Sequence, residues 1–443
     1  MALYNFFYNI LFGIKDIKDG TNIYRNYREL LKQQYYSVSE IRNIQNQKLK
    51  KLVANAFENS PYYRKRLSDL SSTIGEGINI DNIHKLPVLS RADLQENYQD
   101  ILCENVTTCY KDSSGGSTGA PVIFYHDDVY AAMSRSLNML FFDWLGLSPG
   151  DKTAVIWGAD RDLKDASRYD KIMNFLNRVI QINSFSMTED SITAFIKKLN
   201  DFRPKYIYGY SSSLYLTAKY VNTAASLQFT PRAIRSSAEM LYDYQRLEIE
   251  KAFRAPVFDF YGSREVNNIA AECSAHEGLH VFEPARLVEI VDDAGQPVPD
   301  GEVGYVAVTD LVNHTFPFIR YLNGDMAEMR RDSCSCGRGL RILNKIYGRS
   351  SDTIKVDGLF IHGEYFTHIF YNQPNIKQFQ FIQESPMDYK LVLVGTPSPD
   401  EIERFKDTIR NKIGDDKRIE VVLVDEIPSS PSGKHRFTIS KIT

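Results

Sequence analysis

The chain has 443 residues, of which 43% are hydrophobic and 25% are charged. This composition is ordinary for a globular protein, and the length predicts about two to four domains. The 53 Lys and Arg side chains and 56 Asp and Glu side chains leave a net charge of −3, which excludes the strongly basic surface of a general nucleic-acid binder. Five cysteines in so long a chain do not make a disulfide framework, so a reducing, cytoplasmic location is expected.

The N-terminal stretch 1-MALYNFFYNILFGI-14 is apolar, but it is too short to span a bilayer, so no transmembrane segment is expected here. It lacks a basic leader and a small-residue cleavage site, which argues against a signal peptide. As a helix it would be broadly apolar, and Lys15 and Lys18 follow at once. Two interpretations are open: packing on the protein's own surface, or shallow docking on a membrane.

Residues 20–70 are expected to be helical. In 49-LKKLVANAF-57 the apolar residues recur at the spacing of one helix face, and Ser60-Pro61 ends that helix. The segment 87-PVLSRADLQENY-98 begins another helix, with Ser90 as its N-cap and Asp93 in its first turn.

Short apolar runs alternate with helical patterns in the middle of the chain. The runs are 153–158, 205–210, 232–237 and 256–262, and the helical patterns cover 130–145, 188–202 and 241–253. This alternation predicts an α/β class, with a large α/β domain built on a largely parallel sheet. From about residue 279, β-rich runs divided by Gly, Pro and Asp turns predict an antiparallel meander or small barrel.

The last 90 or so residues predict a compact α+β unit. The expected order is strand, helix, strand, strand, helix, strand, over 353–361, 364–372, 377–385, 388–395, 399–414 and 418–427. This order is typical of a ferredoxin-like domain.

The stretch 112-DSSGGSTGAPVIFYHD-127 combines glycines with small hydroxyl residues just before an apolar run. It is not a Walker A loop, because no lysine follows Gly119. Its backbone amides and hydroxyls are suited to wrapping phosphate oxygens, although flexible linkers have a similar composition.

Three further motifs carry carboxylates or a lysine at turns. In 261-YGSREV-266, Tyr261 offers an aromatic face and Glu265 a ligand for Mg2+; an ordinary strand end is the alternative. Asp325 follows a glycine, where it can accept both hydroxyls of a ribose or simply make an Asx turn. Lys434 lies in the Pro/Ser/Gly loop 428-PSSPSGKHRF-437, where a solvated surface charge is the alternative.

Together and in this order, the motifs resemble the acyl-adenylate-forming superfamily. Within it, the chain is most similar to phenylacetate–coenzyme A ligases and their relatives in capsular polysaccharide biosynthesis. The resemblance runs from about residue 30 to the C-terminus and includes the helical lead-in 48-KLKKLVANAFENSPYYRKRL-67.

The resemblance implies specific roles for these residues. The residues that would grip the ATP phosphates are Ser113, Ser114, Gly115, Gly116, Ser117, Thr118 and Gly119. Tyr261 and Gly262 would lie against adenine, Ser263 near the α-phosphate, and Glu265 would bind Mg2+. Ala238 and Glu239 would line the nucleotide pocket, Asp325 and Arg349 would hold the ribose, and Lys434 would be the catalytic lysine.

The resemblance also implies a domain plan and an activity. It implies an adenylation domain over 1–349 with a helical lead-in over 1–80, a hinge at 350–352 and a mobile domain over 353–443. The activity implied is ATP-dependent adenylation of a carboxylic acid, followed by acyl transfer to a thiol, amine or hydroxyl acceptor. Coenzyme A ligation of an aromatic acid and a nucleotide binder without turnover are the alternatives. His362-Gly363 departs from the usual Phe-Pro pair of the family, so the acceptor is open.

Two other sets of residues complete the sequence-based expectations. The acid pocket would include Phe141, Trp144, Tyr208, Tyr210 and Ser237, although buried core positions explain the aromatic residues equally well. Cys334-Ser-Cys336 and 272-ECSAHEGLH-280 together offer three thiols and two imidazoles. The likeness to zinc-bearing ligases implies a structural zinc held by Cys273, His280, Cys334 and Cys336, with His276 as the substitute for His280.

Overall fold

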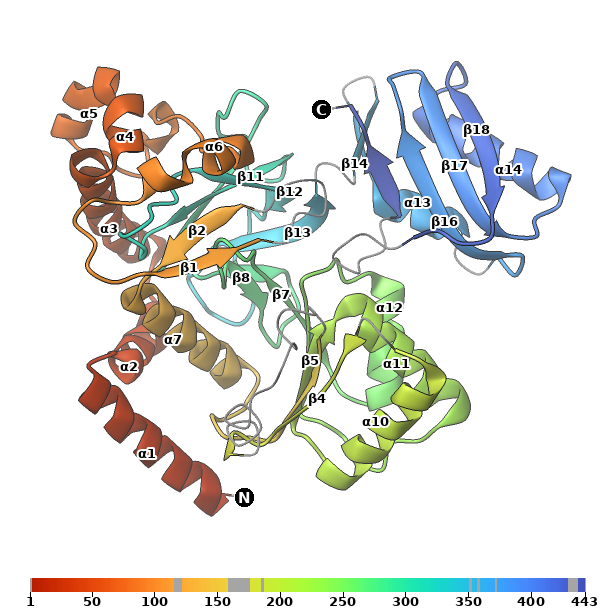
Figure 1. Cartoon of the computed structure of the whole chain (residues 1–443), viewed down its shortest axis with the longest axis horizontal. Helices are drawn as coiled ribbons and strands as arrows, with labels where there is room; N and C mark the ends of the chain where they lie inside the picture. Colours follow the sequence, from red (N-terminus) through yellow and green to blue (C-terminus); the bar gives the residue numbers. More distant parts are fainter. Residues whose placement is uncertain are drawn as a thin grey trace. The chain divides into compact units, whose positions relative to one another are not determined.

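The computed structural model describes residues 2–114, 122–157, 176–184, 187–349, 353–356, 359–370, 373–428 and 437–442. By its internal contacts the chain divides into two compact units (Figure 1). The first comprises 1–115, 120–323 and 327–345, and the second comprises 116–119, 324–326 and 346–443. The predicted hinge at 350–352 lies outside the described residues, so the domain boundaries stay a prediction.

The first unit begins with a series of helices. They are α1 (Ala2–Asp19), α2 (Ile23–Gln33), α3 (Val38–Asn59), α4 (Pro61–Arg66), α5 (Ser71–Glu76) and α6 (Arg91–Ile101), with short 3₁₀ turns at Ser68–Leu70 and Ile83–Lys85. The expected helix ends are confirmed. Ser60 separates α3 from α4, and Ser90 and Asp93 form a capping box at the start of α6.

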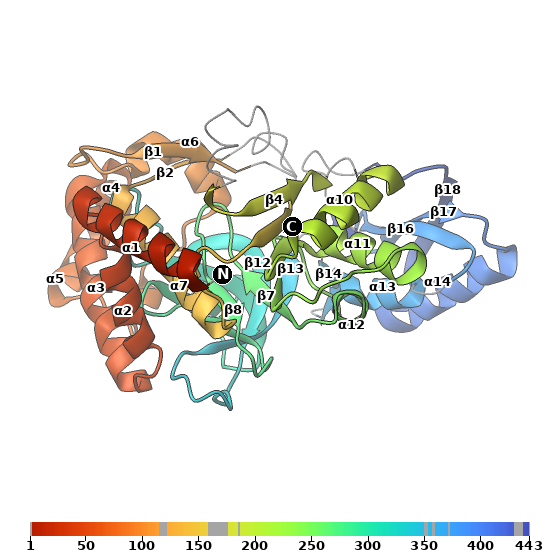
Figure 2. The same cartoon turned by 90° about the horizontal axis from the view of Figure 1, so that it is seen from below.

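The helix α1, red in Figures 1 and 2, contacts α2 through Asp16 and through Phe12, whose ring lies edge-on to Tyr24. Asp16 accepts hydrogen bonds from the backbone N–H groups of Ile23 (2.8 Å) and Tyr24 (3.0 Å). The apolar side chains of Leu11, Ile14 and Ile17 are instead 66%, 58% and 83% exposed. A helix with the length and apolarity to cross a membrane does not occur among the described residues. Contact of α1 with a membrane surface stays a prediction.

The predicted parallel strands are present, and they form one side of an 11-stranded sheet. They are β3 (Thr153–Ile156), β4 (Val179–Ile182), β5 (Tyr206–Tyr210), β6 (Ala233–Ser237) and β7 (Val257–Tyr261). The helices are α7 (Asp128–Trp144), α10 (Glu189–Phe202), α11 (Ser211–Ala224) and α12 (Asp243–Phe253). Alternate strand residues face opposite sides, so Ile207 and Ile234 pack under α10–α12, whereas Tyr206 and Phe258 pack against α7.

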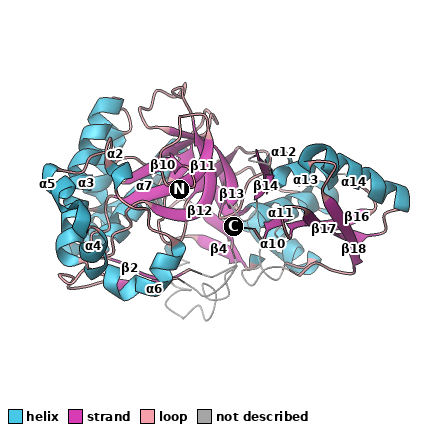
Figure 3. Cartoon of the chain, turned by 90° about the horizontal axis from the view of Figure 1, so that it is seen from above, coloured by secondary structure: helices cyan, strands magenta, loops and turns pink. Residues whose placement is uncertain are grey.

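The expected β-rich segment is also confirmed, and its strands continue the same sheet (Figure 3). They are β8 (Ala270–Glu272), β9 (Leu279–Val281), β10 (Arg286–Val291), β11 (Val303–Asp310), β12 (Tyr321–Met329) and β13 (Ile342–Arg349). The sheet order is β10-β11-β12-β13-β9-β8-β7-β6-β5-β3-β4. The change from parallel to antiparallel pairing occurs at β7 and β8.

The second unit has the expected α+β class, but its first expected strand is wrong. In place of one strand over 353–361, β14 (Thr353–Val356) and β15 (Leu359–His362) pair antiparallel and make their own two-stranded sheet. The register pairs Val356 with Leu359, and Asp-Gly between them is a strong hairpin signal. The other elements are α13 (Gly363–Phe370), β16 (Ile376–Gln383), β17 (Asp388–Gly395), α14 (Pro399–Ile413), β18 (Arg418–Val424) and β19 (Thr438–Ser440), with sheet order β18-β17-β16-β19.

Candidate functional site

The Ser/Gly loop connects the strands of an antiparallel hairpin. The hairpin consists of β1 (Tyr110–Ser113) and β2 (Ile123–His126), and the backbone N–H of Ser114 donates to the carbonyl of Val122 at 2.9 Å. The Ser114 hydroxyl is buried and has no hydrogen-bond partner among the described residues. Gly115, Gly116, Ser117, Thr118 and Gly119 lie outside the described residues, so the phosphate-binding role of this loop stays a prediction.

A tight turn follows β7 at the expected adenine and magnesium motif. The Ser263 N–H donates to the Val266 carbonyl, and the Val266 N–H donates to the Ser263 hydroxyl, both at 3.0 Å. At Gly262, an added Cβ would lie only 2.9 Å from the Asn268 nitrogen, so the turn has no room for a side chain there. The Tyr261 hydroxyl accepts a 2.6 Å hydrogen bond from Asn323.

The Glu265 loop is attached to the β1–β2 hairpin by two contacts. The Glu265 carbonyl lies 3.1 Å from Nε2 of His126 in β2, and because a carbonyl only accepts, this nitrogen carries the hydrogen. Arg264 lies 3.8 Å from the carboxylate of Asp112, at the end of β1. The Glu265 carboxylate is 6% exposed and faces Arg91 at 3.7 Å. The carboxylate expected to bind a cation therefore lies beside the hairpin that carries the Ser/Gly loop.

A buried network supports this loop from behind. The Asn267 N–H donates to the Tyr130 hydroxyl at 2.8 Å, and Tyr130 stacks on His126 with ring centroids 4.0 Å apart. Arg286 donates to the Asn267 carbonyl at 3.0 Å and pairs with Asp310 at 2.7 Å, both side chains being fully buried. Burial lowers the pKa of His126 below 6.5, so its ring is neutral at pH 7. No sequence motif marks this network, because its members are far apart along the chain.

The expected nucleotide-pocket pair lies after β6. Ala238 has a φ of 67°, a left-handed conformation that is costly for a residue with a Cβ. The Glu239 carboxylate accepts a 2.9 Å hydrogen bond from the N–H of Ser212, in the first turn of α11. A carboxylate is stabilised at a helix N-terminus, so Glu239 has a structural partner here, and its role toward a nucleotide stays a prediction.

The remaining nucleotide and catalytic residues lie in or near the second unit. Asp325 is inside β12, after Gly324 with a φ of 88°, so the alternative of a turn between strands is wrong. Arg349 is the last residue of β13, and its side chain is not described. Lys434 lies outside the described residues, and its catalytic role stays a prediction.

Three of the expected acid-pocket residues line the α7 face of the parallel sheet. Phe141 is fully buried, Tyr208 lies near it, and the Ser237 hydroxyl donates to the Phe260 carbonyl at 3.0 Å. Tyr210 stacks on Trp157 with ring centroids 4.2 Å apart. Both interpretations of these aromatic residues, as core or as pocket, are compatible with this burial.

Trp144 lies toward the helical lead-in and the cysteine cluster. Its indole N–H donates to Gln34 at 2.8 Å, and its ring stacks on Phe282 at 5.4 Å and lies edge-on to His280 at 5.8 Å. Its contact with the expected pocket residues is through Phe141, so its part in acid binding stays a prediction.

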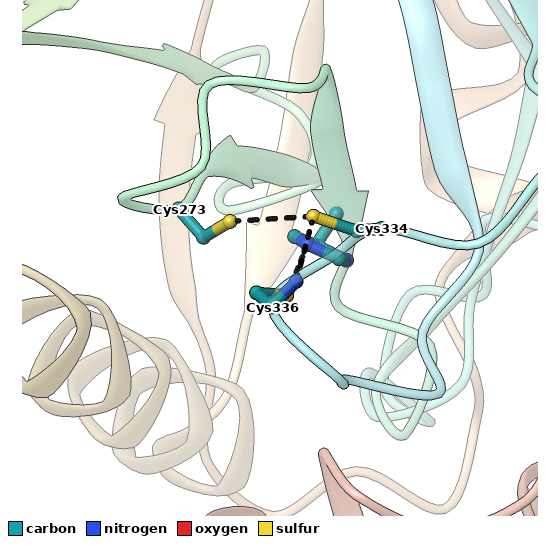
Figure 4. A group of neighbouring side chains, drawn as sticks. Cys273, Cys334 and Cys336 are labelled. Atoms are coloured by element: carbon teal, nitrogen blue, oxygen red, sulfur yellow. Dashed lines mark hydrogen bonds between the residues drawn. The ribbon is translucent and has the colours of Figure 1, made fainter.

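The four expected metal ligands come together in the structure. The ligand atoms of Cys273, His280, Cys334 and Cys336 all lie within 4.8 Å of one another, and Figure 4 shows the three cysteine side chains converging. Nε2 of His280 lies 3.3 Å from the Cys336 sulfur, and its Nδ1 lies 3.4 Å from the Leu340 carbonyl. If Nδ1–H donates to this carbonyl, Nε2 is left as the atom that can bind a metal. A metal-binding histidine usually donates its other ring N–H to such an acceptor.

The spacing within the cluster fits a tetrahedral zinc ion. The sulfurs of Cys273 and Cys334 are 3.7 Å apart, whereas Zn–S bonds of ~2.3 Å at tetrahedral angles place two sulfurs ~3.8 Å apart. This separation excludes a disulfide, and all five cysteines are free. Burial lowers the pKa of His280 to about 4, so its imidazole is neutral and can bind a metal at pH 7. His276 lies outside the cluster, 3.3 Å from Glu272.

Comparison with known proteins agrees with this fold and these motifs. The model of the CapK C-terminal domain family matches residues 353–441. Protein CapK of Staphylococcus aureus is 27% identical over 91% of this chain and 90% of its own length. Phenylacetate-coenzyme A ligase of Thermus thermophilus is 25% identical over 90% of this chain and 96% of its own. The chain is a relative of CapK and of the phenylacetate–coenzyme A ligases.

This relationship confirms the resemblance predicted from the motifs and, with it, the expectation of an enzyme of the ligase class. Among solved structures, 2-hydroxyisobutyryl-CoA ligase in complex with R3-HIB-AMP matches with a TM-score of 0.71. It is 18% identical, over 93% of this chain and 91% of the ligase. The predicted fold class, a large N-terminal and a small C-terminal domain, is confirmed.

Proposed function

We propose that the chain uses ATP to convert a carboxylic acid to an acyl-adenylate, releasing pyrophosphate, and then transfers the acyl group to an acceptor. The observation that carries the proposal is the attachment of the Glu265 loop to the β1–β2 hairpin through His126 and Arg264. This attachment joins a buried carboxylate to the base of a Ser/Gly loop suited to phosphates. The family relationship supports the same conclusion.

The reaction needs charge neutralisation more than covalent catalysis. A substrate carboxylate oxygen attacks the α-phosphorus, a bond to the bridging oxygen breaks, and pyrophosphate leaves. Because both reactants are anionic, positive charge near the α-phosphate lowers the barrier. In the proposal Lys434 supplies that charge, and Asp325 and Arg349 hold the ribose. Movement of the C-terminal domain about 350–352 would withdraw Lys434 before acyl transfer.

Glu265 is suited to binding Mg2+ because its carboxylate is buried and has few competing partners in the described part of the chain. The group is almost fully buried, and its ion-pair partner among the described residues is Arg91, at 3.7 Å. Mg2+ is commonly held by one or two carboxylates together with substrate phosphates, so a single glutamate beside a phosphate loop is sufficient. The ion would neutralise charge on the phosphate oxygens. Glu265 would orient it, and Arg91 would be released to the phosphates.

The two candidate functions differ in the group that accepts the acyl chain. Relatives named as coenzyme A ligases favour a thiol acceptor, whereas the CapK likeness favours the capsular branch of the family. In that branch an amine or hydroxyl of a sugar or amino acid is the acceptor that we propose to test beside coenzyme A. Ligation of an aromatic acid to coenzyme A is the second candidate function.

We also propose that Cys273, His280, Cys334 and Cys336 bind a structural Zn2+. The distances among their ligand atoms and the hydrogen bond of His280 support this assignment. A zinc ion with four protein ligands has no open position for a substrate. We therefore expect the ion to stabilise the fold rather than to take part in the reaction. It would link the β8–β9 segment to the residues that precede β13.

Pyrophosphate release tests the proposal. The purified chain is incubated with ATP, Mg2+ and a panel of aromatic, amino and uronic acids, with hydroxylamine as the acyl trap. We expect one class of acid to stimulate release, and we expect Glu265→Gln and Lys434→Ala each to lower it by ~10²-fold or more. Glu189→Gln on α10 and Lys441→Ala are the matched controls, because both lie outside the proposed site.

Saturable ATP binding without acid-dependent release from any acid would favour a nucleotide binder without turnover. Equal loss of release in the variants and in their controls would refute the assigned roles of Glu265 and Lys434. With a productive acid in hand, coenzyme A, amines and sugar hydroxyls are then compared as acceptors in place of hydroxylamine.

A further inference from the structure

Arg235 lies among the residues of the expected acid pocket, although the sequence motifs do not mark it. In the parallel register it pairs with Tyr208 of β5 on one side and Phe258 of β7 on the other. Paired residues in a ladder share a face of the sheet, and Ser237, two residues further along β6, lies on that face as well. The side chain of Arg235 therefore projects from the face that α7 covers.

The guanidinium is surrounded by aromatic rings. Its Cζ atom lies 3.4 Å from the ring centroid of Phe260, 5.8 Å from that of Tyr208 and 5.9 Å from that of Phe141. Cation–π contacts of this kind are favourable, and they also exclude water from the faces of the charge. They supply no acceptor for the five N–H donors of the group.

Hydrogen-bond acceptors are scarce around Arg235. Its Nη1 donates to the side-chain oxygen of Asn138 at 3.3 Å. By strict geometry neither its buried Nε nor the buried hydroxyl of Tyr206 makes a hydrogen bond among the described residues, although the Tyr206 hydroxyl lies close enough to the guanidinium to interact with it. The buried Nε–H of Arg235 thus lacks a well-aligned acceptor, which is costly for a donor removed from water.

The buried arginines Arg286 and Arg320 and the partly buried Arg246 each have a carboxylate partner. Arg286 pairs with Asp310 at 2.7 Å, Arg320 with Glu289 at 3.1 Å, and Arg246 with Glu272 at 2.8 Å. Within the described part of the chain, no carboxylate lies within ion-pair distance of Arg235. Arg235 is half-buried, and a charge that is partly removed from water is usually paired, so we attribute the missing partner to the site rather than to the fold.

Asp259 is the carboxyl group that most evidently experiences the charge of Arg235. It lies in β7 on the alternate face from Phe258 and Phe260, and burial together with Glu272 raises its pKa to about 7. Near neutral pH a substantial fraction of this group is uncharged. Asp259 therefore does not replace a direct counter-ion for Arg235.

We propose that Arg235 binds a second anionic group of the acid substrate, so that the preferred substrate carries another carboxylate or a phosphate besides the carboxyl group that is activated. This inference rests on the proposed adenylation function. The planar guanidinium is suited to a carboxylate or phosphate through paired N–H donors. A simple aromatic acid would leave the guanidinium without an anionic partner among its aromatic neighbours, so the pocket selects against it.

Matched pairs of acids test the proposal with the full chain, ATP and Mg2+. The pairs are isophthalate and its monoamide, glutarate and glutaramate, and 3-phosphoglycerate and glycerate. Pyrophosphate release gives kcat/KM for each member. We expect a preference of ~10- to 100-fold for the dianionic member of at least one pair, which is the usual contribution of a hydrogen bond to a charged group. The carboxylate and phosphate pairs distinguish the two kinds of anion.

Variants of Arg235 separate specificity from folding. Arg235→Met keeps the length of the side chain and removes the charge, and we expect it to bring the ratio within a pair to about one, mainly by raising KM for the dianion. Arg235→Lys keeps the positive charge but loses the paired N–H donors of the guanidinium, so we expect an intermediate ratio of kcat/KM within a pair. Arg25→Met on the exposed side of α2 is the matched control. Thermal unfolding shows whether each variant is folded.

A wild-type preference for monoanionic acids would overturn the proposal, as would equal losses for both members of a pair in Arg235→Met. If no acid gives pyrophosphate, adenylation fails, and binding of isophthalate and its monoamide is measured by calorimetry. A preference for isophthalate that Arg235→Met abolishes would then support the anion site by itself. Absence of that preference would refute it.

Discussion

Removing the charge of Asp310 tests whether the buried pair with Arg286 supports the Glu265 loop. Both side chains are 0% exposed, and they are 2.7 Å apart. The Asp310→Asn substitution keeps the shape of the side chain but leaves the guanidinium without a counter-ion. Breaking a buried pair in this way costs about 3–5 kcal/mol. Oδ2 of Asp310 has no partner in the described structure, so the new amide displaces no accepted hydrogen bond, and we expect about 3 kcal/mol.

Tryptophan fluorescence reports on the unit that contains this pair. The two tryptophans of the chain, Trp144 and Trp157, both belong to the first unit. A unit of roughly 340 residues unfolds with an entropy of about 0.7 kcal/mol per kelvin, so a loss of ~3 kcal/mol lowers its melting temperature by ~4 °C. Since Arg286 also holds the Asn267 carbonyl, pyrophosphate release is expected to fall even at temperatures where the variant is folded.

Asp300 provides a matched control for the same chemical change. It pairs with Arg341 at 2.9 Å, but the two side chains are 44% and 38% exposed. Exposed pairs contribute little, so Asp300→Asn is expected to change stability by less than about 0.5 kcal/mol and the melting temperature by less than ~1 °C. If Asp310→Asn lowers the melting temperature no more than Asp300→Asn does, the assigned role of burial is refuted.

The remaining predictions concern the metal cluster, one buried acid and the first helix. Elemental analysis of the purified chain is expected to find about one zinc per chain, lost in Cys334→Ser and kept in Cys103→Ser; equal zinc in both variants would contradict the assigned ligands. Burial raises the pKa of Glu283 from 4.5 to about 7, so the folded chain keeps a proton that the unfolded chain releases, and this contribution to stability is lost as the pH rises through that range. Glu283→Gln should therefore gain melting temperature relative to wild type between pH 5 and pH 8, whereas the exposed Glu189→Gln should not, and parallel curves would refute the shift. If the exposed side of α1 docks on membranes, the chain will sediment with phosphatidylcholine–phosphatidylglycerol vesicles, and Ile17→Asp will abolish this more than Leu247→Asp, an equally apolar exposed site; equal effects would assign the binding elsewhere.

Much of the architecture was predictable from local sequence. The capping box of Ser90 and Asp93 and the end of α3 before Pro61 depend on contacts within a few residues. The alternation of apolar runs and helical patterns likewise predicts β5, α12 and their neighbours, because periodicity reports which side of an element is buried. The hairpin of β14 and β15 was missed, because 353–361 was expected to be one strand, although Asp-Gly between the two strands is a local hairpin signal.

The candidate site was predictable only as a set of motifs in order. The sequence by itself placed Glu265, Asp325 and the three cysteines Cys273, Cys334 and Cys336 in recognisable motifs. The roles of these residues were assigned from the resemblance to a family. Spacing did not determine which histidine completes the cysteine cluster. His280 does so because β9 pairs with β13 and directs its ring toward Cys336, whereas His276 turns toward Glu272.

The contacts that give the site its electrostatic character were decided by the tertiary structure alone. Arg286 meets Asp310 because β10 pairs with β11 in a register that places the two residues opposite each other. Within the described ranges, Arg235 has aromatic neighbours and no carboxylate at ion-pair distance because of its place between β5 and β7. Strand register and sheet order join residues that are distant in sequence, and no local pattern encodes them. Whether an arginine of this sheet has a counter-ion is therefore known only once its neighbours in space are known.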